Sequence, residues 1–110
     1  EPIARLAAKL SRQFGPHHYD RRDIHYPLEK RAGLMAWLAG HPPERLLKSP
    51  LDQVHSYDGV KFVAADGAWL MLRGSGTEPV LRIYAESGSE KGTQTLLRLG
   101  LRLIETADLQ

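Results

Sequence analysis

Residues 58–86 read DGVKFVAADGAWLMLRGSGTEPVLRIYAE, and this stretch decides the fold. It contains Asp-Gly pairs at residues 58–59 and 66–67, and such pairs are a strong signal for tight turns between antiparallel strands. The apolar segment 68–73 follows the second turn. Residues 79–86 then alternate between apolar and polar side chains, which is typical of a strand with one buried face. The stretch therefore predicts consecutive antiparallel hairpins.

The segments around these hairpins have the apolar period of helices. We expect helices over residues 3–14 and 27–39. A last helix is expected to begin at a capping box formed by Ser87 and Glu90. Gly100, inside that helix, costs about 1 kcal/mol relative to alanine. We expect it to permit close packing on the sheet.

Two further segments complete the predicted fold. Residues 16–26 have no helical period and indicate a polar edge strand or a loop, and residues 44–48 indicate one more helical turn. Helices segregated from an antiparallel sheet define the α+β class. The sequence thus predicts one domain, residues 1–110, in which helices pack on one face of an antiparallel sheet of about four strands.

Composition excludes several classes of protein. The chain of 110 residues contains no cysteine, which excludes a disulfide scaffold and a cysteine-ligated zinc site. Its formal net charge of +2 is too small for a polybasic surface. No apolar stretch is long enough to span a membrane, and no signal peptide is recognised. We therefore expect a cytoplasmic protein that contacts neither nucleic acid nor membrane. The start at Glu1 suggests a segment of a longer polypeptide.

The segment 73–79, RGSGTEP, carries the clearest chemistry. Its two glycines let the backbone bend so that successive N–H groups face inward, and such concave backbone binds anions. Arginine binds phosphate through a forked contact and stays charged. The candidate phosphate ligands are the following: Arg73, Ser75, Gly76, Thr77 and Arg82. From the chemistry alone, an ordinary hairpin loop is the alternative.

The same segment, together with LRIYAE at residues 81–86, resembles the phosphate-binding signature of the α-D-phosphohexomutases. At residue frequencies of about 5%, a match to SGTEP alone would occur by chance roughly once in three million positions. The resemblance covers residues 58–86 and the helix that follows. It implies the last of four domains in that family, with an architecture like that of the TATA-box-binding protein.

In the α-D-phosphohexomutases, a phosphoserine of the first domain exchanges its phosphoryl group with a sugar phosphate. This reaction interconverts hexose 1-phosphates and hexose 6-phosphates through a bisphosphate. The resemblance implies that the five candidate ligands grip the phosphate that is not transferred, and that the domain closes over the substrate. The implied Mg²⁺ belongs to a domain absent from this chain, as does the serine. The chain alone is therefore expected to be inactive and to bind no cofactor, with no catalytic residue and no metal ligand of its own.

The resemblance also implies partners: the other domains of the same chain, and hexose phosphates. The sequence RIYAE favours the phosphoglucomutase and phosphomannomutase branch, and so glucose or mannose phosphate. Two alternatives stay open, a nucleic-acid-binding module and a stand-alone interaction module.

Other polar and aromatic residues have simpler interpretations. His17 and His18 are adjacent and would point to opposite faces of a strand, which disfavours joint binding of a metal. Trp69 is interpreted as a packing residue. Glu78 is expected to form an ion pair that orients Arg73 and Arg82.

Overall fold

A computed structural model describes residues 17–109. Six strands form one antiparallel sheet in the order β1-β6-β5-β4-β3-β2. The strands are these: β1 (His18–His25), β2 (Arg45–Leu46), β3 (Ser49–His55), β4 (Val60–Ala64), β5 (Trp69–Gly74) and β6 (Val80–Ser87). The fold class α+β is confirmed. The helix expected over residues 3–14 lies outside the described residues.

The predicted count of about four strands is wrong, because the sheet has six. Of the two interpretations of residues 16–26, the polar edge strand is confirmed. At one edge, the polar segment β1 pairs with β6 over its whole length, from His18 opposite Ser87 to His25 opposite Val80. At the other edge, residues 44–48 do not make the expected helical turn. Leu46 is fully buried and pairs with Ser49, so this segment is drawn into the short strand β2 instead.

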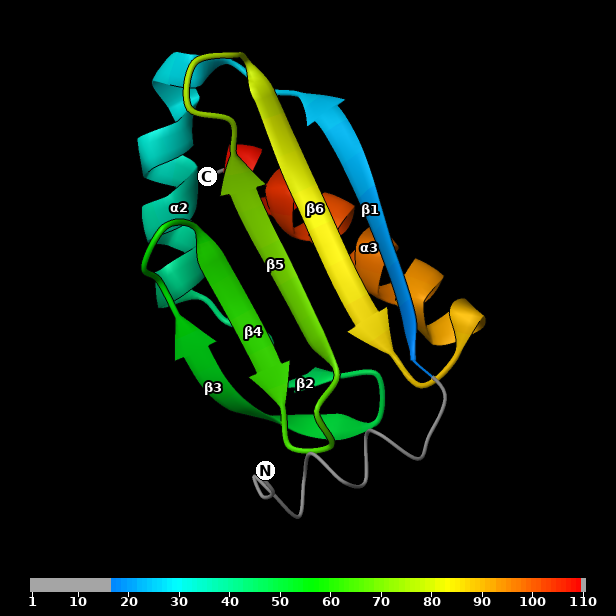
Figure 1. Ribbon diagram of the computed structural model, residues 1–110. Helices are drawn as coiled ribbons and strands as arrows, with labels where there is room; N and C mark the ends of the chain where they lie inside the picture. The colour runs from blue at the N-terminus through cyan, green and yellow to red at the C-terminus, as the bar shows by residue number, and fades with distance from the viewer. Residues whose placement is uncertain (1–16, 110) are drawn as a thin grey trace.

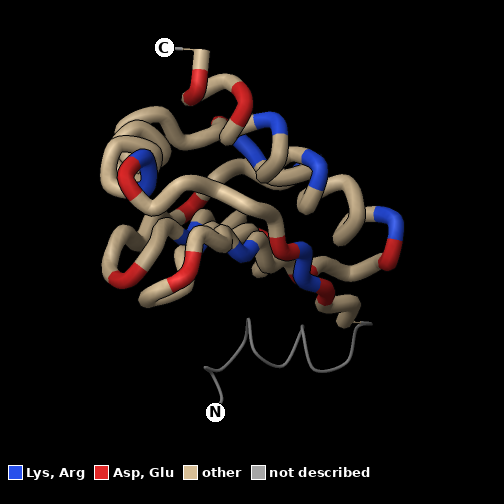
Figure 2. The backbone as a smooth tube through the Cα atoms, turned by 90° about the horizontal axis from the view of Figure 1, so that it is seen from above, with Lys and Arg blue, Asp and Glu red and all other residues tan. Residues whose placement is uncertain are grey.

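Helical segments cover one face of the sheet (Figure 1). A 3-10 turn, η1 (Leu28–Lys30), leads into α2 (Arg31–Gly40), close to the predicted helix over residues 27–39. The last helix is α3 (Glu90–Asp108), which packs mainly against β6 and β1. Seen from above, the helices form a layer over the sheet, and basic and acidic residues are interspersed along the chain (Figure 2).

The start of α3 differs in detail from its prediction. Ser89 is the N-cap, and its side chain accepts a hydrogen bond from the backbone N–H of Gly92. Ser87 is still part of β6, so its hydroxyl contacts Thr93 rather than capping the helix. The role predicted for Gly100 is confirmed, because a Cβ there would lie 2.8 Å from Cγ2 of Ile83.

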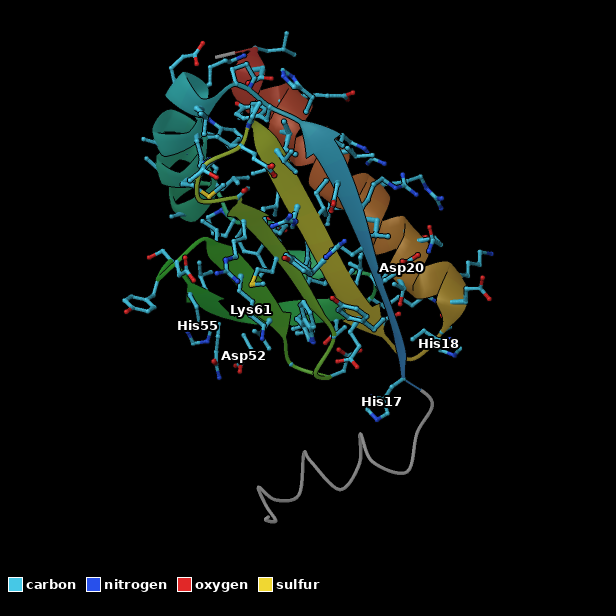
Figure 3. All side chains as sticks on the ribbon, turned by 45° about the horizontal axis from the view of Figure 1, so that its top comes forward. His17, His18, Asp20, Asp52, His55 and Lys61 are labelled. Atoms are coloured by element: carbon cyan, nitrogen blue, oxygen red, sulfur yellow. The ribbon has the colours of Figure 1, made fainter. Side chains whose placement is uncertain are left out.

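The core lies between the sheet and the helices. Alternate residues of β4, β5 and β6 point into it, as their alternating burial requires. Its largest fully buried side chains are Phe62, Leu38, Leu46, Leu70, Leu72, Leu81, Ile83, Leu96, Leu97, Val60 and Thr93. The other face of the sheet carries no helix of the described chain, and half-buried polar and aromatic side chains lie on it, such as Lys61 (Figure 3).

Candidate functional site

The loop of residues 75–79 joins β5 to β6 at one end of the sheet, beside the first turn of α2 (Figure 1). Two backbone hydrogen bonds close it: the N–H of Ser75 donates to the Val80 carbonyl (3.0 Å), and the N–H of Val80 donates to the Glu78 carbonyl (2.7 Å). Three predicted ligands, Ser75, Gly76 and Thr77, therefore lie together in a closed turn.

The two predicted arginines stand directly opposite each other where this loop meets the sheet. Arg73 on β5 is paired in register with Arg82 on β6, and both lie on the open face, away from the helices. Like charges opposite each other on neighbouring strands repel, which disfavours this pairing unless other charges compensate. The structure therefore brings together all five residues predicted to bind phosphate, at the cost of two adjacent cations.

Carboxylates on either side compensate these cations. Asp58, in the β3–β4 turn, lies 3.2 Å from a terminal nitrogen of Arg73, measured from its Oδ2. Asp23 on β1 is opposite Arg82, with 3.8 Å between Asp23 Oδ2 and Arg82 Nε. The ion pairs expected from Glu78 are thus replaced by others. Its position in the turn directs its backbone carbonyl, rather than its side chain, into the local contacts.

Several hydrogen-bond donors of the site have no partner among the described residues. They include the hydroxyls of Ser75 and Thr77. They also include the buried Nε of Arg82, because the carboxylate of Asp23, at 3.8 Å, is too far away to accept a hydrogen bond from it. Buried polar atoms are normally hydrogen-bonded in native structures, so the Nε of Arg82 is an exception. Donors of this kind, next to two guanidinium groups, suit an anion with several oxygen atoms.

Sequence inspection missed two residues that hold the loop. Arg31, the first residue of α2, donates hydrogen bonds to the Ser75 carbonyl and to the Glu78 carbonyl, the latter at 2.9 Å. The N–H of Tyr26 donates to the Pro79 carbonyl (2.9 Å). Both residues lie more than forty positions from the loop in sequence, and no local motif marks them.

The side chain of Tyr26 also ties the loop to the end of α3. Its hydroxyl donates to Oδ1 of Asp108 (2.9 Å), and Nζ of Lys30 lies 3.5 Å from the same oxygen. Burial and the neighbouring carboxylate of Asp108 raise the pKa of Tyr26 to about 12. The phenol therefore stays protonated near neutral pH and keeps its donor role.

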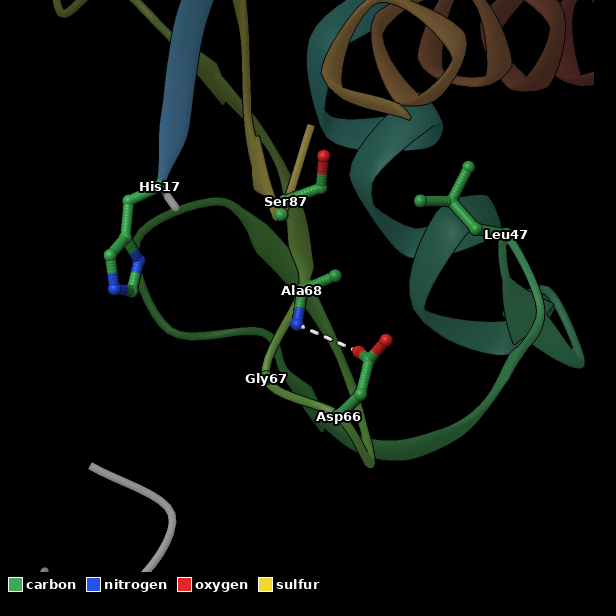
Figure 4. A pocket seen from close by; sticks show the side chains of 7 residues that line it. His17, Leu47, Asp66, Gly67, Ala68 and Ser87 are labelled. Atoms are coloured by element: carbon green, nitrogen blue, oxygen red, sulfur yellow. Dashed lines mark hydrogen bonds between the residues drawn. The ribbon is translucent and has the colours of Figure 1, made fainter. Parts of the chain in front are cut away.

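Other candidate residues lie away from the loop. Trp69 is half-buried on the open face, where its indole N–H donates to Glu86 (2.8 Å), Lys61 lies over its ring and Tyr19 packs against it, consistent with the predicted packing role. His17 lines a hollow near the β4–β5 turn, at the opposite end of β5 (Figure 4). That hollow contains none of the five predicted ligands.

Comparison with known proteins extends these observations. Residues 30–98 match the family described as phosphoglucomutase/phosphomannomutase, C-terminal domain. The chain belongs to this family. The match includes Arg31, the whole β5–β6 loop and the first half of α3, so the five predicted ligands and Arg31 lie within the family domain.

Three relatives indicate how much of a larger protein the chain represents. It is 42% identical to a phosphoglucomutase/phosphomannomutase of Thermococcus kodakarensis, over 96% of this chain and 23% of the relative. It is 28% identical to a phosphopentomutase of the same organism, over 84% and 20%, respectively. It is 29% identical to a probable phosphoglucosamine mutase of Thermococcus gammatolerans, over 96% and 22%. The chain thus spans about a fifth to a quarter of these relatives.

No helix within residues 17–109 combines the length and the apolar character needed to cross a membrane.

Proposed function

We propose that this phosphoglucomutase/phosphomannomutase C-terminal domain binds the phosphate group of a hexose phosphate that is not being transferred. The full-length enzyme would interconvert hexose 1-phosphates and hexose 6-phosphates, with glucose or mannose phosphate as substrate. One observation carries the proposal: Arg73 and Arg82 meet at a loop whose hydroxyls, on Ser75 and Thr77, have no partner among the described residues.

The chemistry of a mutase explains why such a grip is useful. The sugar must be held in two opposite orientations, and in each the enzyme meets a phosphate dianion at the end remote from the reaction. A site that contacts this phosphate and not the ring accepts both orientations. Binding energy gained at the remote group can then orient the reacting end. If the domain moves, the same contacts would favour closure and exclude water.

The chemical step itself is assigned to other parts of the full-length protein. The Mg²⁺ that the family resemblance implies would need a cluster of oxygen or nitrogen ligands. Among residues 17–109, no three side chains of His, Asp or Glu lie together in a way that fits such an ion. The role proposed here requires no metal, and we expect the isolated domain not to catalyse the reaction.

The substitution Arg73→Ala in the full-length protein tests this function. We expect kcat/KM for glucose 1-phosphate to fall by about a hundredfold, because a forked contact to a dianion is lost. Lys91→Ala is the matched control, since it removes one positive charge from an exposed residue in the first turn of α3, the helix that follows β6. Equal kcat/KM values for the Arg73 variant and the control would contradict the proposal. Repeating the assay with mannose 1-phosphate and glucosamine 1-phosphate would identify the sugar.

A further inference from the structure

Arg31 is the only described residue outside the β5–β6 hairpin whose side chain donates hydrogen bonds to the loop. We propose that it is a positioning residue that holds the loop in the conformation that binds phosphate. The inference rests on the function proposed above and deepens it. It adds a residue of α2, distant in sequence, to a site otherwise formed by two strands and a turn.

The two hydrogen bonds of Arg31 span the loop. One terminal nitrogen of its guanidinium donates to the Ser75 carbonyl, and the other donates to the Glu78 carbonyl at 2.9 Å. A planar guanidinium presents its donors in a fixed geometry, so it sets the separation of the two carbonyls it binds. Arg31 therefore fixes the two sides of the turn relative to each other and to α2.

Holding the Ser75 carbonyl also orients the next N–H group. Within a planar trans peptide unit, the C=O and the N–H point in opposite directions. Because the Ser75 carbonyl is directed at Arg31, the N–H of Gly76 is directed away from it. This N–H has no backbone partner among the described residues. Arg31 thus keeps one side of the loop occupied and leaves a donor on the other side for the ligand.

Gly74 provides the space that this contact needs. A Cβ at this position would lie 2.5 Å from both Cδ and Cζ of Arg31, which is closer than real Cβ atoms approach. Any side chain at residue 74 would therefore displace the guanidinium from the loop. The glycine at the end of β5 and the arginine at the start of α2 form a coupled pair.

The partners of its guanidinium group distinguish Arg31 from the other two arginines of the site. Arg73 and Arg82 each have an aspartate partner, whereas Arg31 forms no ion pair with a described carboxylate. Its positive charge is directed only at backbone carbonyls. A phosphate dianion in the loop would therefore gain the field of a third cation without competing with a carboxylate for it.

Three variants of the full-length protein test the role of Arg31, with glucose 1-phosphate as the probe and its Kd as the readout. We expect Arg31→Ala to raise Kd by about tenfold to a hundredfold, the usual range for charge-assisted hydrogen bonds. Arg31→Lys keeps the charge but cannot bind both carbonyls in the same geometry, so we expect an intermediate rise of about threefold to tenfold. Lys91→Ala, the charge control, should leave Kd unchanged.

The results separate this inference from the proposed function. If Arg73→Ala raises Kd while Arg31→Ala or Arg31→Lys binds as the wild type does, the positioning role is wrong and the function stands. If Arg73→Ala also leaves Kd unchanged, the proposed function is wrong. The lysine variant decides the matter if the alanine variant does not fold.

A double-substitution cycle distinguishes the positioning role of Arg31 from a general role in stability. Gly74→Ala alone should weaken binding, because its methyl group displaces Arg31. In the Arg31→Ala background the methyl group has room, so we expect the same substitution to add less than about a twofold change in Kd. Independent, multiplicative effects of the two substitutions would overturn the coupling, since residues in contact are expected to be non-additive.

Discussion

The two loops at opposite ends of β5 connect antiparallel strands in the same sheet, yet they use their polar groups in different ways. In the β4–β5 turn, the carboxylate of Asp66 accepts a hydrogen bond from the N–H of Ala68, and the N–H of Asp66 itself donates to Ser49 Oγ. The N–H of Gly67 donates to the Ala64 carbonyl. The donors of this turn are therefore used within the fold, two of them inside the hairpin and one on Ser49 of β3.

The β5–β6 loop is organised in the opposite way. Its backbone carbonyls are bound by Arg31 from another element, and the hydroxyls of Ser75 and Thr77 have no partner among residues 17–109. A loop held from outside can leave its own donors available to a ligand. The hydrogen bonds that a glycine-containing turn makes therefore distinguish a structural turn from a binding loop better than its amino-acid composition does.

Among the substitutions that test this comparison of the two loops, the largest effect is expected from removing the hydroxyls of Ser75 and Thr77. The double variant Ser75→Ala/Thr77→Ala of the full-length protein should raise the Kd for glucose 1-phosphate by at least about tenfold, because hydrogen bonds to a charged ligand are lost. The free energy of unfolding of the 110-residue chain should change by less than about 0.5 kcal/mol, since neither hydroxyl has a partner within residues 17–109. A loss of stability without a change in Kd would reverse the proposed difference between the loops.

The next effect concerns the glycine of the other loop. Gly67 has a φ of 98°, in the region that side chains rarely adopt. We expect Gly67→Ala to lower the free energy of unfolding by about 1–2 kcal/mol, as measured by urea titration of the chain. The Kd for glucose 1-phosphate of the full-length variant should stay unchanged, and a weakened Kd would show that the two loops are not independent.

Asp66→Ala should have a smaller effect of the same kind. It removes the side-chain acceptor for the N–H of Ala68, so we expect a loss of about 1 kcal/mol in the free energy of unfolding. Asp66→Asn retains an acceptor oxygen and serves as the control. A chain as stable with alanine as with asparagine would mean that this turn does not depend on its own hydrogen bonds.

The smallest effect is expected for Gly76→Ala. A Cβ at Gly76 would meet no atom within 4 Å, and its φ lies outside the positive region. The free energy of unfolding should therefore change by less than about 0.5 kcal/mol, in contrast to the effect at Gly67. A loss as large as that of Gly67→Ala in the same urea titration would show that backbone strain is common to both loops.

Local signals predicted the centre of this fold well and its edges poorly. The Asp-Gly turns and the alternating pattern of residues 79–86 lie where short-range geometry decides the structure, and the hairpins follow from them. Leu46 shows where prediction from local sequence fails. Its segment has no strand pattern of its own, and it becomes a strand because the core buries its side chain and β3 offers it a partner.

The candidate site likewise contains residues that the sequence could identify and residues that it could not. The five predicted ligands are close in sequence, so a motif could identify them together. Arg31, Asp23 and Asp58 are brought to the site only by the pairing of strands and the packing of α2. Nearness in sequence favours Glu78 as the partner of the arginines, whereas cross-strand register supplies Asp23 and the β3–β4 turn supplies Asp58.

The aspartates beside Arg73 and Arg82 have a consequence for selectivity. Asp23, Arg82, Arg73 and Asp58 form a row across the sheet in which each arginine has a carboxylate beside it. The carboxylate of Asp23 also pairs with Arg21 on its own strand, at 3.2 Å. A polyanion gains little from such a row, because each contact must first displace a carboxylate. A compact dianion also accepts hydrogen bonds from the β5–β6 loop, and these bonds can offset the cost of displacing a carboxylate. We therefore expect binding to weaken only gently as ionic strength rises, unlike the steep decline typical of nucleic-acid-binding surfaces.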